Sequence, residues 1–497
     1  MLPYSSTGHV AWYARACLAL AIVAAPVHAQ QRTSDTLTVT LDDAVEMALD
    51  QGYDARAAEA ARDAALFRDA AFHSRLLPQL GLQATAPAFN RSIIDVLQPD
   101  GSTLFRTQNQ TTAALTATVS QIVPFTGGEF FVTSSLTRLS VSGAQDALTY
   151  SSTPVNIGFR QPILRPNTVG WDRKEQPVRT EVADRQYLEA REGIALQTAS
   201  LFFDVYAAQV DWETATTNVA VNDTLYTLNN GRYEIGRIGE NDLLQSELAL
   251  LQARTNLDAA VLALERALAA LRIGLRLPPD APLAIVVPER APDFEPDTAL
   301  AVAEALRNRA VVSSLELQHV QARRRVTEAK LNNGFGAVLQ ASYGFNATGN
   351  GLGGAYEDLL EAQRVTFSVE IPLIQWGARH NDVGAAEMEL DAVEHTSQAT
   401  LDQTAHDARF AALQLAQAAR GLALSAKADT VADKRFEVAY NRYGIGRISI
   451  DNLFIAQREK DQARQQYVRA LRGYWEAYYQ LRQVTLYDFE EGMRIGG

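Results

Sequence analysis

Long stretches of this chain repeat their apolar residues at the spacing of coiled-coil helices. In one such stretch Leu257, Val261, Leu264, Leu268 and Leu271 recur at alternating intervals of four and three residues. This spacing places the five side chains on one side of a helix, as in a coiled-coil seam. The pattern therefore predicts helices that pack lengthwise against other helices.

The predicted helices differ greatly in length. We expect long helices at 172–229 and 379–439, return helices at 240–275 and 450–485, and shorter helices at 53–77 and 310–331. Each long helix would span about 85–90 Å, far beyond the usual helix of a globular domain. One return helix and one shorter helix together match the length of one long helix. We therefore expect them to stack end to end beside it in a slender column.

Other segments alternate polar and apolar residues with the period of two that is typical of strands. We expect strands at 79–86, 112–123, 129–141, 154–163, 337–347 and 364–374. Their Thr, Ser and Gln residues alternate with apolar ones, as in a wall with one wet and one apolar face. A soluble β-sandwich would show the same alternation. So few strands feeding such long helices favour a barrel shared among subunits.

One sequence string occurs twice. Arg-Tyr-x-Ile-Gly-Arg-Ile begins at Arg232 and again at Arg442, and ten of the 23 positions from Arg232 to Arg254 match their partners 210 residues later. The same offset pairs Pro162 with Pro372, so the intervening stretch has one length in both halves. A constant register of this kind indicates an internal duplication.

The first half of the chain carries an insertion in its β part. Ala48 matches Ala305 at an offset of 257, so 47 extra residues lie between about Gln83 and Val155. The string at 122–131 reads as a turn between two strands, which predicts an additional hairpin. Whether this hairpin joins a barrel wall or covers an opening stays open at this point.

The N-terminus reads as a secretory signal peptide. A polar lead with Arg15 precedes a short apolar core and a small-residue cleavage site after Ala29. This apolar run is too short to span a membrane comfortably. The chain then divides into a signal peptide (1–29), a first structural repeat (30–276), a Pro-rich connecting segment (277–297), a second structural repeat (298–486) and a C-terminal tail (487–497).

Composition and charge exclude several kinds of partner and fold. The chain is 47% hydrophobic with a net charge of −13, which argues against nucleic acid as a partner because phosphate binding needs a basic face. The single cysteine, Cys17, lies in the leader, so the mature chain would have no disulfide. No later segment is apolar enough for a transmembrane helix.

These features together resemble the outer-membrane efflux protein family, the TolC-like channels. The resemblance rests on the leader, the duplicated unit, "QPILR" and "IPLIQWG" where strands lead into helices, and the two repeated strings. It covers nearly all of the mature chain. It implies an α+β membrane protein, a homotrimer whose outer-membrane β-barrel continues as a long periplasmic α-helical coiled-coil barrel.

The resemblance also implies a function. It is that of an outer-membrane channel of a tripartite efflux or type I secretion system: a passive export duct without enzyme activity, cofactor or metal. Its partners would be outer-membrane lipid, a periplasmic adaptor (membrane fusion) protein and, through it, an inner-membrane pump of a Gram-negative-type cell. Neither the cargo nor the pump class, RND or ABC, can be read from the sequence. The alternative is a periplasmic coiled-coil adaptor or scaffold without a membrane barrel.

The two copies of the string supply the candidate site. We expect Gly236 and Gly446 to take the left-handed conformation that ends each long helix and turns the chain. The resemblance adds that a periplasmic adaptor docks on these turns. The residues assigned to docking are Arg232, Tyr233, Gly236, Arg237, Arg442 and Gly446.

The resemblance further implies a gate, with an acidic residue six positions after each of these glycines. Asp242 fits this position, whereas Asn452 does not, although Asp451 is adjacent. The arginine implied two positions after the second glycine is Ile448 here, with Arg447 one position earlier. We therefore expect the two turns to contribute differently to the latch. The assigned gate residues are Asp242, Tyr443, Arg447 and Asp451.

Overall fold

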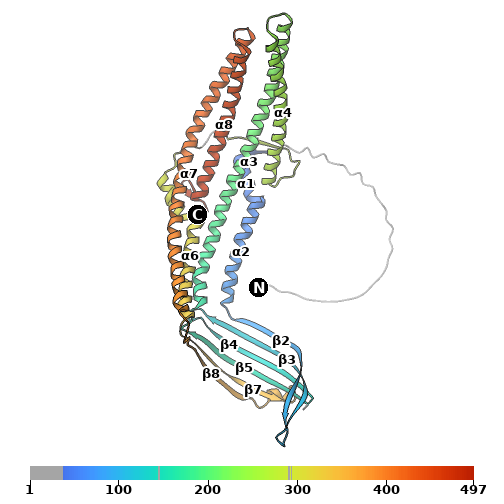
Figure 1. Ribbon diagram of the computed structural model, residues 1–497, viewed down its shortest axis with the longest axis vertical. Helices are drawn as coiled ribbons and strands as arrows, with labels where there is room; N and C mark the ends of the chain where they lie inside the picture. The colour runs from blue at the N-terminus through green and yellow to red at the C-terminus, as the bar shows by residue number, and fades with distance from the viewer. Residues whose placement is uncertain (1–36, 144–145, 289–291, 293, 497) are drawn as a thin grey trace, which may run out of the picture.

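The protein is a slender column of helices that stands on the end of one sheet (Figure 1). This computed structural model describes residues 37–143, 146–288, 292 and 294–496. The predicted signal peptide, 1–29, lies outside the described residues. None of the described helices is both long and apolar enough to cross a membrane.

In the part of the chain that the structure describes, each half contributes four α-helices in the same order. They are α1 (Leu41–Gln51), α2 (Tyr53–Arg75), α3 (Thr168–Glu234) and α4 (Glu240–Gly274), then α5 (Thr298–Asn308), α6 (Ala310–Asn332), α7 (Ala378–Gly444) and α8 (Ile450–Thr485). Corresponding helices have 11 and 11, 23 and 23, 67 and 67, and 35 and 36 residues. The two long helices are each about 100 Å long, slightly longer than expected.

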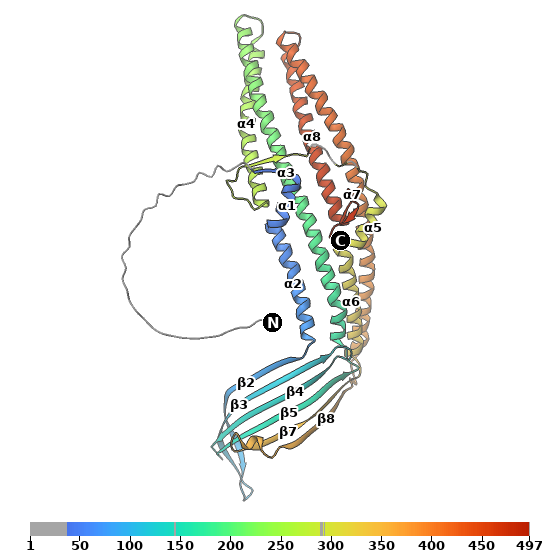
Figure 2. The same cartoon turned by 180° about the vertical axis from the view of Figure 1, so that it is seen from behind.

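The shorter helices stack end to end along the long ones, as predicted. Figures 1 and 2 show α2 and α4 in line beside α3, and α6 and α8 in line beside α7. Thr40 and Asp297 cap α1 and α5 through their side chains. The main core lies at mid-height, where Leu41, Phe202, Phe203, Tyr474 and Trp475 join α1, α3 and α8.

Two short sheets lie beside this core and were not predicted. The Pro-rich segment contains β6 (Leu283–Val286), which pairs in parallel with β1 (Leu37–Thr40). The C-terminal tail forms the hairpin of β9 (Tyr487–Asp488) and β10 (Met493–Arg494). Leu283 and Ile285 of β6 and Phe489 of the tail pack against the core, so these described parts of both segments belong to the column.

The large sheet is antiparallel and has six strands. In sheet order they are β2 (Gln79–Leu97), β3 (Thr103–Val123), β4 (Gly128–Ser142), β5 (Ala147–Ile163), β7 (Gly336–Gly349) and β8 (Leu360–Glu370). The additional hairpin predicted for the first half is β3–β4. The strand predicted at 364–374 was wrong at its end, because β8 stops at Glu370, two residues before a proline that has no N–H to donate.

The two faces of the large sheet differ in polarity. One row of directly paired residues runs across five strands through Leu80, Val119, Val132, Ile157 and Tyr343. The next row, on the opposite face, runs through Gly81, Thr118, Thr133, Asn156 and Gly344. Because neighbouring rows point to opposite faces, one face is apolar and the other polar. The expected alternation of polar and apolar residues between the two faces is confirmed along these rows.

Candidate functional site at the helical tips

The first long helix ends in a defined backbone motif at the first tip, the turn from Arg232 to Asp242. The N–H groups of Gly236 and Arg237 donate to the carbonyl oxygens of Tyr233 and Arg232, both at 2.8 Å. This pair of hydrogen bonds is a Schellman motif, which needs a left-handed residue after the helix. Gly236 supplies it with φ +68°, as predicted.

The second tip, the turn from Arg442 to Asn452, repeats the motif. The N–H groups of Gly446 and Arg447 donate to the carbonyl oxygens of Tyr443 and Arg442, both at 2.9 Å. Gly446 has φ +72°, again as predicted. The repeated string therefore encodes one local backbone structure that depends on its glycine.

The return helices begin differently at the two tips. Ser449 caps α8, and its hydroxyl oxygen accepts from the backbone N–H of Asn452 at 3.5 Å and from its side-chain amide at 3.0 Å. Gly239, at the start of α4, has no side chain with which to cap. Asp242 lies in the first turn of α4, where a negative charge is favoured by the helix dipole. The difference between Asp242 and Asn452 therefore accompanies a difference in capping. Asn452 donates to the cap residue Ser449, whereas Asp242 lies in the first turn of a helix without a side-chain cap.

The two tips contact each other within one chain. The Tyr443 hydroxyl donates to Asn229 Oδ1 of α3 at 2.7 Å, in a buried position. Arg232 Nη2 donates to the carbonyl oxygen of Gly444 at 3.0 Å, and the guanidinium lies 5.1 Å from the Tyr443 ring centre. Leu225 and Leu453 complete a small apolar cluster around Tyr443. This cluster joins the end of α7 to α3.

The equivalent tyrosine of the first tip makes no such contact. Tyr233 is 42% exposed, whereas Tyr443 is 5% exposed. The position equivalent to Asn229, 210 residues later, is Ala439, whose side chain cannot accept a hydrogen bond. The Asn229–Tyr443 bond therefore has no counterpart built from the same sequence positions.

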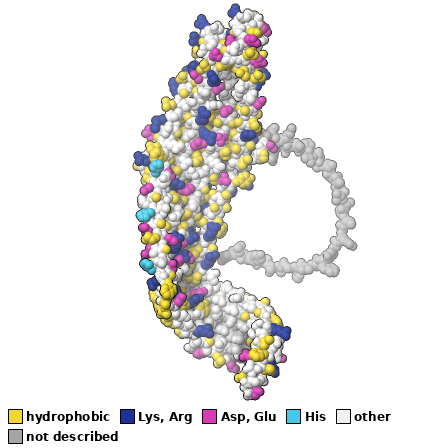
Figure 3. Space-filling model, viewed as in Figure 1, with side chains coloured by type: hydrophobic (Ala, Val, Ile, Leu, Met, Phe, Trp, Pro, Cys, Tyr) yellow, Lys and Arg dark blue, Asp and Glu magenta, His cyan; other side chains and the backbone are white. Residues whose placement is uncertain are grey.

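Of the remaining predicted site residues, one contacts the other hairpin and three make no ion pair or side-chain hydrogen bond with a described residue. Gln245 Nε2 of α4 donates to Asp451 Oδ1 of α8 at 2.6 Å, a second link between the hairpins. Among the described residues, none makes an ion pair or a side-chain hydrogen bond with Asp242, Arg237 or Arg447. Figure 3 shows basic side chains at the ends of both hairpins.

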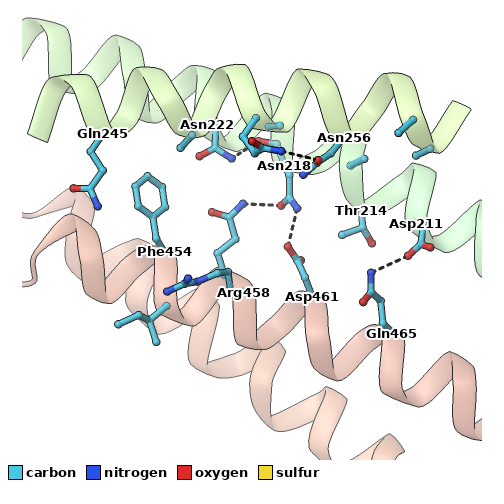
Figure 4. A pocket seen from close by; sticks show the side chains of 18 of the residues that line it. Asp211, Thr214, Asn218, Asn222, Gln245, Asn256, Phe454, Arg458, Asp461 and Gln465 are labelled. Atoms are coloured by element: carbon cyan, nitrogen blue, oxygen red, sulfur yellow. Dashed lines mark hydrogen bonds between the residues drawn. The ribbon is translucent and has the colours of Figure 1, made fainter.

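Below the tips, a groove of about 760 Å³ separates the two hairpins (Figure 4). Asn218 of α3 lies at its centre: its Nδ2 donates to Asp461 Oδ2 at 2.8 Å, and its Oδ1 accepts from Gln457 Nε2 at 2.7 Å. Burial raises the pKa of the Asp461 carboxyl, although the hydrogen bond from Asn218 and the charge of Lys460 act in the opposite direction. A hydrogen-bonded cluster of polar side chains from α3 and α8 therefore lies in the groove.

The asparagines of α3 that build these contacts were not among the predicted site residues. Asn218, Asn222 and Asn229 follow one another at intervals of four and seven, which places them on one side of the helix. Asn222 Oδ1 and Asn229 Nδ2 are buried without a hydrogen-bond partner among the described residues. A polar stripe of this spacing inside a coiled-coil pattern was the available signal.

Comparison with known proteins gives a structural answer only. No protein-family model and no curated protein sequence matches the chain. The CmeC outer membrane channel of Campylobacter jejuni is similar over 92% of this chain and 87% of its own, with TM-score 0.66 and 16% identity. The outer membrane protein VceC of Vibrio cholerae is similar over 92% of this chain and 96% of its own, with TM-score 0.65 and 15% identity.

A third similar structure is the MtrE outer membrane channel of Neisseria gonorrhoeae in its open state. The similarity extends over 90% of this chain and 88% of MtrE, with TM-score 0.62 and 15% identity. At these low identities, structural similarity establishes the fold alone. The roles of single residues have to be inferred from the geometry of this chain. The chain has the fold of the TolC-like outer-membrane channels, as the resemblance predicted.

Proposed function

We propose that this protein is the outer-membrane channel of a tripartite efflux or type I secretion system. Three copies would form a tube whose β-barrel lies in the outer membrane and whose helical barrel crosses the periplasm. The tube is a passive duct without enzyme activity, and an inner-membrane pump supplies the driving force. Its fold matches solved outer-membrane channels over about nine-tenths of the chain.

The observation that carries this proposal is the two-faced sheet with open edges. The outer strands β2 and β8 each have a neighbour on one side only. A single copy would leave these edges and an apolar face unsatisfied, and a closed barrel in lipid satisfies both. Lipid would cover the apolar face and water the polar one.

The helical column also has faces that need a partner. On α4, Leu244, Leu248 and Leu251 are exposed at intervals of four and three residues. On α7, the exposed Leu424, Val431 and Val438 are spaced seven residues apart. Both are coiled-coil spacings. In the proposed trimer, α4 of one copy packs against α7 of the next and closes the helical wall.

The tips would close the periplasmic end of the tube. Three copies with two tips each give six turns around the axis, which suits docking of an adaptor protein through Arg232, Tyr233, Arg237 and Arg442. Within one copy, Tyr443 and Asp451 hold the hairpins together. Asp242 and Arg447, which have no partner within the described chain, would pair across copies.

Extraction from membranes tests this proposal. We expect heat-resistant trimers in the detergent-solubilised outer-membrane fraction. Recovery as a soluble periplasmic monomer would contradict the channel and support the alternative, an adaptor or scaffold without a membrane barrel.

A further inference from the structure

We infer that the junction between the large sheet and α3 binds one anionic phospholipid per copy of the chain. The headgroup phosphate lies between Arg173 and Lys174, and an acyl chain lies along the apolar face of the sheet. This inference rests on the proposed outer-membrane channel, in which the junction lies at the level of the periplasmic leaflet.

The headgroup end of the site is a cavity between the β3–β4 turn and the beginning of α3. It has a volume of about 490 Å³, and the residues that line it include Phe125, Asn167, Trp171, Arg173 and Lys174. Asn167 Nδ2 donates to the carbonyl oxygen of Pro124 at 2.8 Å, which holds the turn beside the helix. The cavity is therefore formed by two fastened elements of the fold.

The two cations of this cavity have no acidic partner. Arg173 and Lys174 are exposed, and neither takes part in an ion pair with any described residue. The flanking carboxylates of α3, Asp172 and Glu175, pair with Arg324 Nη1 instead, at 2.7 and 3.0 Å. The positive charge of the cavity is thus available to an anion. Each basic residue near an anionic lipid surface strengthens binding roughly fivefold.

Both cations lie against aromatic rings. The Arg173 guanidinium is 5.3 Å from the ring centre of Phe125, and Lys174 Nζ is 4.4 Å from the ring of Trp171. Phe125 is 84% exposed, so a large apolar side chain projects from the turn. Exposed rings beside basic side chains are typical of the headgroup region of a bilayer, where one end of a side chain is apolar and the other wet.

The acyl-chain end of the site is an apolar groove of about 360 Å³ on the large sheet. Phe130 of β4, Ile157 and Phe159 of β5 and Tyr343 of β7 line it, and the ring centres of the two phenylalanines are 4.6 Å apart. Phe130, Ile157 and Tyr343 are each about half exposed. Lipid hydrocarbon lying in the groove would cover these side chains.

Gln161 connects the two ends of the site. It follows Phe159 by two residues in β5, so it lies on the same face of the sheet and nearer to α3. Its Nε2 donates to the carbonyl oxygen of Thr126, beside Phe125, at 3.0 Å. The groove thus leads to the turn that forms one wall of the cavity. A lipid with its phosphate in the cavity can place its hydrocarbon in the groove.

The second half of the chain does not repeat this site. At the offset of 210 residues, the positions of Trp171, Arg173 and Lys174 hold Asn381, Val383 and Gly384. The turn that supplies Phe125 belongs to the insertion of the first half. We therefore expect one anionic lipid per copy and three per trimer.

Apolar side chains mark the same level of the molecule at the second junction. Leu373, Ile374 and Trp376, between β8 and α7, are 89%, 71% and 93% exposed. Figure 3 shows hydrophobic side chains gathered where the column meets the sheet. Exposure of this extent is typical of a surface that contacts lipid or another protein. It supports a leaflet at the height of Arg173 and Lys174.

Native mass spectrometry of the detergent-solubilised trimer tests the inference. The full chain is titrated with dioleoylphosphatidylglycerol, which is anionic, and separately with zwitterionic dioleoylphosphatidylcholine, and the bound lipids are counted. We expect three phosphatidylglycerol molecules per trimer at concentrations at which phosphatidylcholine does not bind. Equal binding of the two lipids would overturn the inference. So would displacement of the lipid by equimolar inorganic phosphate, because that result would assign the site to a free anion.

A double variant removes the charges and leaves the fold intact, because both side chains are exposed. Arg173→Gln combined with Lys174→Gln should weaken phosphatidylglycerol binding roughly 30-fold, and Arg173→Lys combined with Lys174→Arg should retain it. Arg420→Gln combined with Lys427→Gln is the matched control. It removes two exposed charges from α7 at about 60 Å from the sheet and should leave binding unchanged.

The outcomes separate this site from the proposed function. Unchanged binding in the Arg173→Gln and Lys174→Gln variant, or an equal loss in the control, would overturn the inference. Recovery of the full chain as a soluble monomer would overturn the proposed channel and this inference together. Conducting trimers without a preference for phosphatidylglycerol would overturn this inference alone.

Discussion

The two helical tips share one backbone and differ in their side-chain contacts. Gly236 and Gly446 end their helices in the same Schellman motif, yet Tyr443 is buried against α3 while Tyr233 faces solvent. The turn depends on a glycine that is present in both occurrences of the repeated string. The contact depends on Asn229, and the equivalent position in the second half of the chain is Ala439. The repeated string thus keeps the turn without keeping the interaction.

This difference suggests a division of labour between the tips. The second tip is held to α3 through Tyr443 and to α4 through Asp451. The first tip supplies Arg232 to this contact, and the side chains of Tyr233, Arg237 and Asp242 make no hydrogen bond or ion pair with any other described residue. We expect the second tip to dominate the stability of the closed end, and the first to contact neighbouring copies or an adaptor.

The largest effect should come from removing the buried tyrosine. Tyr443→Ala loses apolar burial, a hydrogen bond and the contact with Arg232, and should destabilise the tip locally by about 3 kcal/mol. Hydrogen exchange of residues 436–454 measures this loss. Tyr233→Ala is the matched control and should leave exchange at both tips nearly unchanged. Equal acceleration by the two variants would contradict the asymmetry.

The next effect should be the same at both tips. Gly236→Ala and Gly446→Ala each place a side chain on a left-handed residue with open space around it, so backbone strain alone costs about 1–2 kcal/mol. Thermal unfolding of the two variants measures the cost. A difference larger than about 1 kcal/mol between them would show that the two turns are not equivalent backbone structures.

A double-mutant cycle isolates the hydrogen bond itself. Asn229→Ala and Tyr443→Phe, alone and combined, should give a coupling energy of about 1 kcal/mol. The equivalent pair, Ala439→Asn and Tyr233→Phe, should show none. Coupling in the second cycle would show that an asparagine at position 439 is enough to create the contact, and that the two tips otherwise have equivalent geometry.

The smallest effect should be a pH dependence at the groove. Because burial raises the pKa of Asp461, the folded chain holds this proton more tightly than the unfolded chain does. Its contribution to stability is therefore complete below the ordinary pKa of about 3.8 and is lost as pH rises through the raised value. Asp461→Asn should flatten this part of the stability–pH profile measured by denaturant unfolding. An unchanged slope would contradict the assignment.

The sequence was sufficient for features set by local pattern. The apolar stripe of the helices and the left-handed Gly236 and Gly446 each depend on residues within one or two turns. Strand alternation likewise predicted the two faces of the sheet. These features need no knowledge of distant partners.

Features made by distant segments could not be read in the same way. Tyr443 and Asn229 lie 214 positions apart, and no periodicity pairs them. The β1–β6 pair was missed because four-residue strands in a Pro-rich context carry little signal. β2 was expected to end near residue 86 but reaches Leu97, because pairing with β3 extends it through a region of weaker alternation.

Single-channel conductance in planar bilayers tests the central claim most directly, namely that this chain forms a tube held closed by its second tip. The full-length protein should insert as a channel of low conductance. Tyr443→Ala should raise that conductance several-fold, and Tyr233→Ala should leave it unchanged. Inserted protein that conducts equally in all three forms would contradict the assignment of the gate, and membrane-inserted trimers without any conductance would contradict the channel.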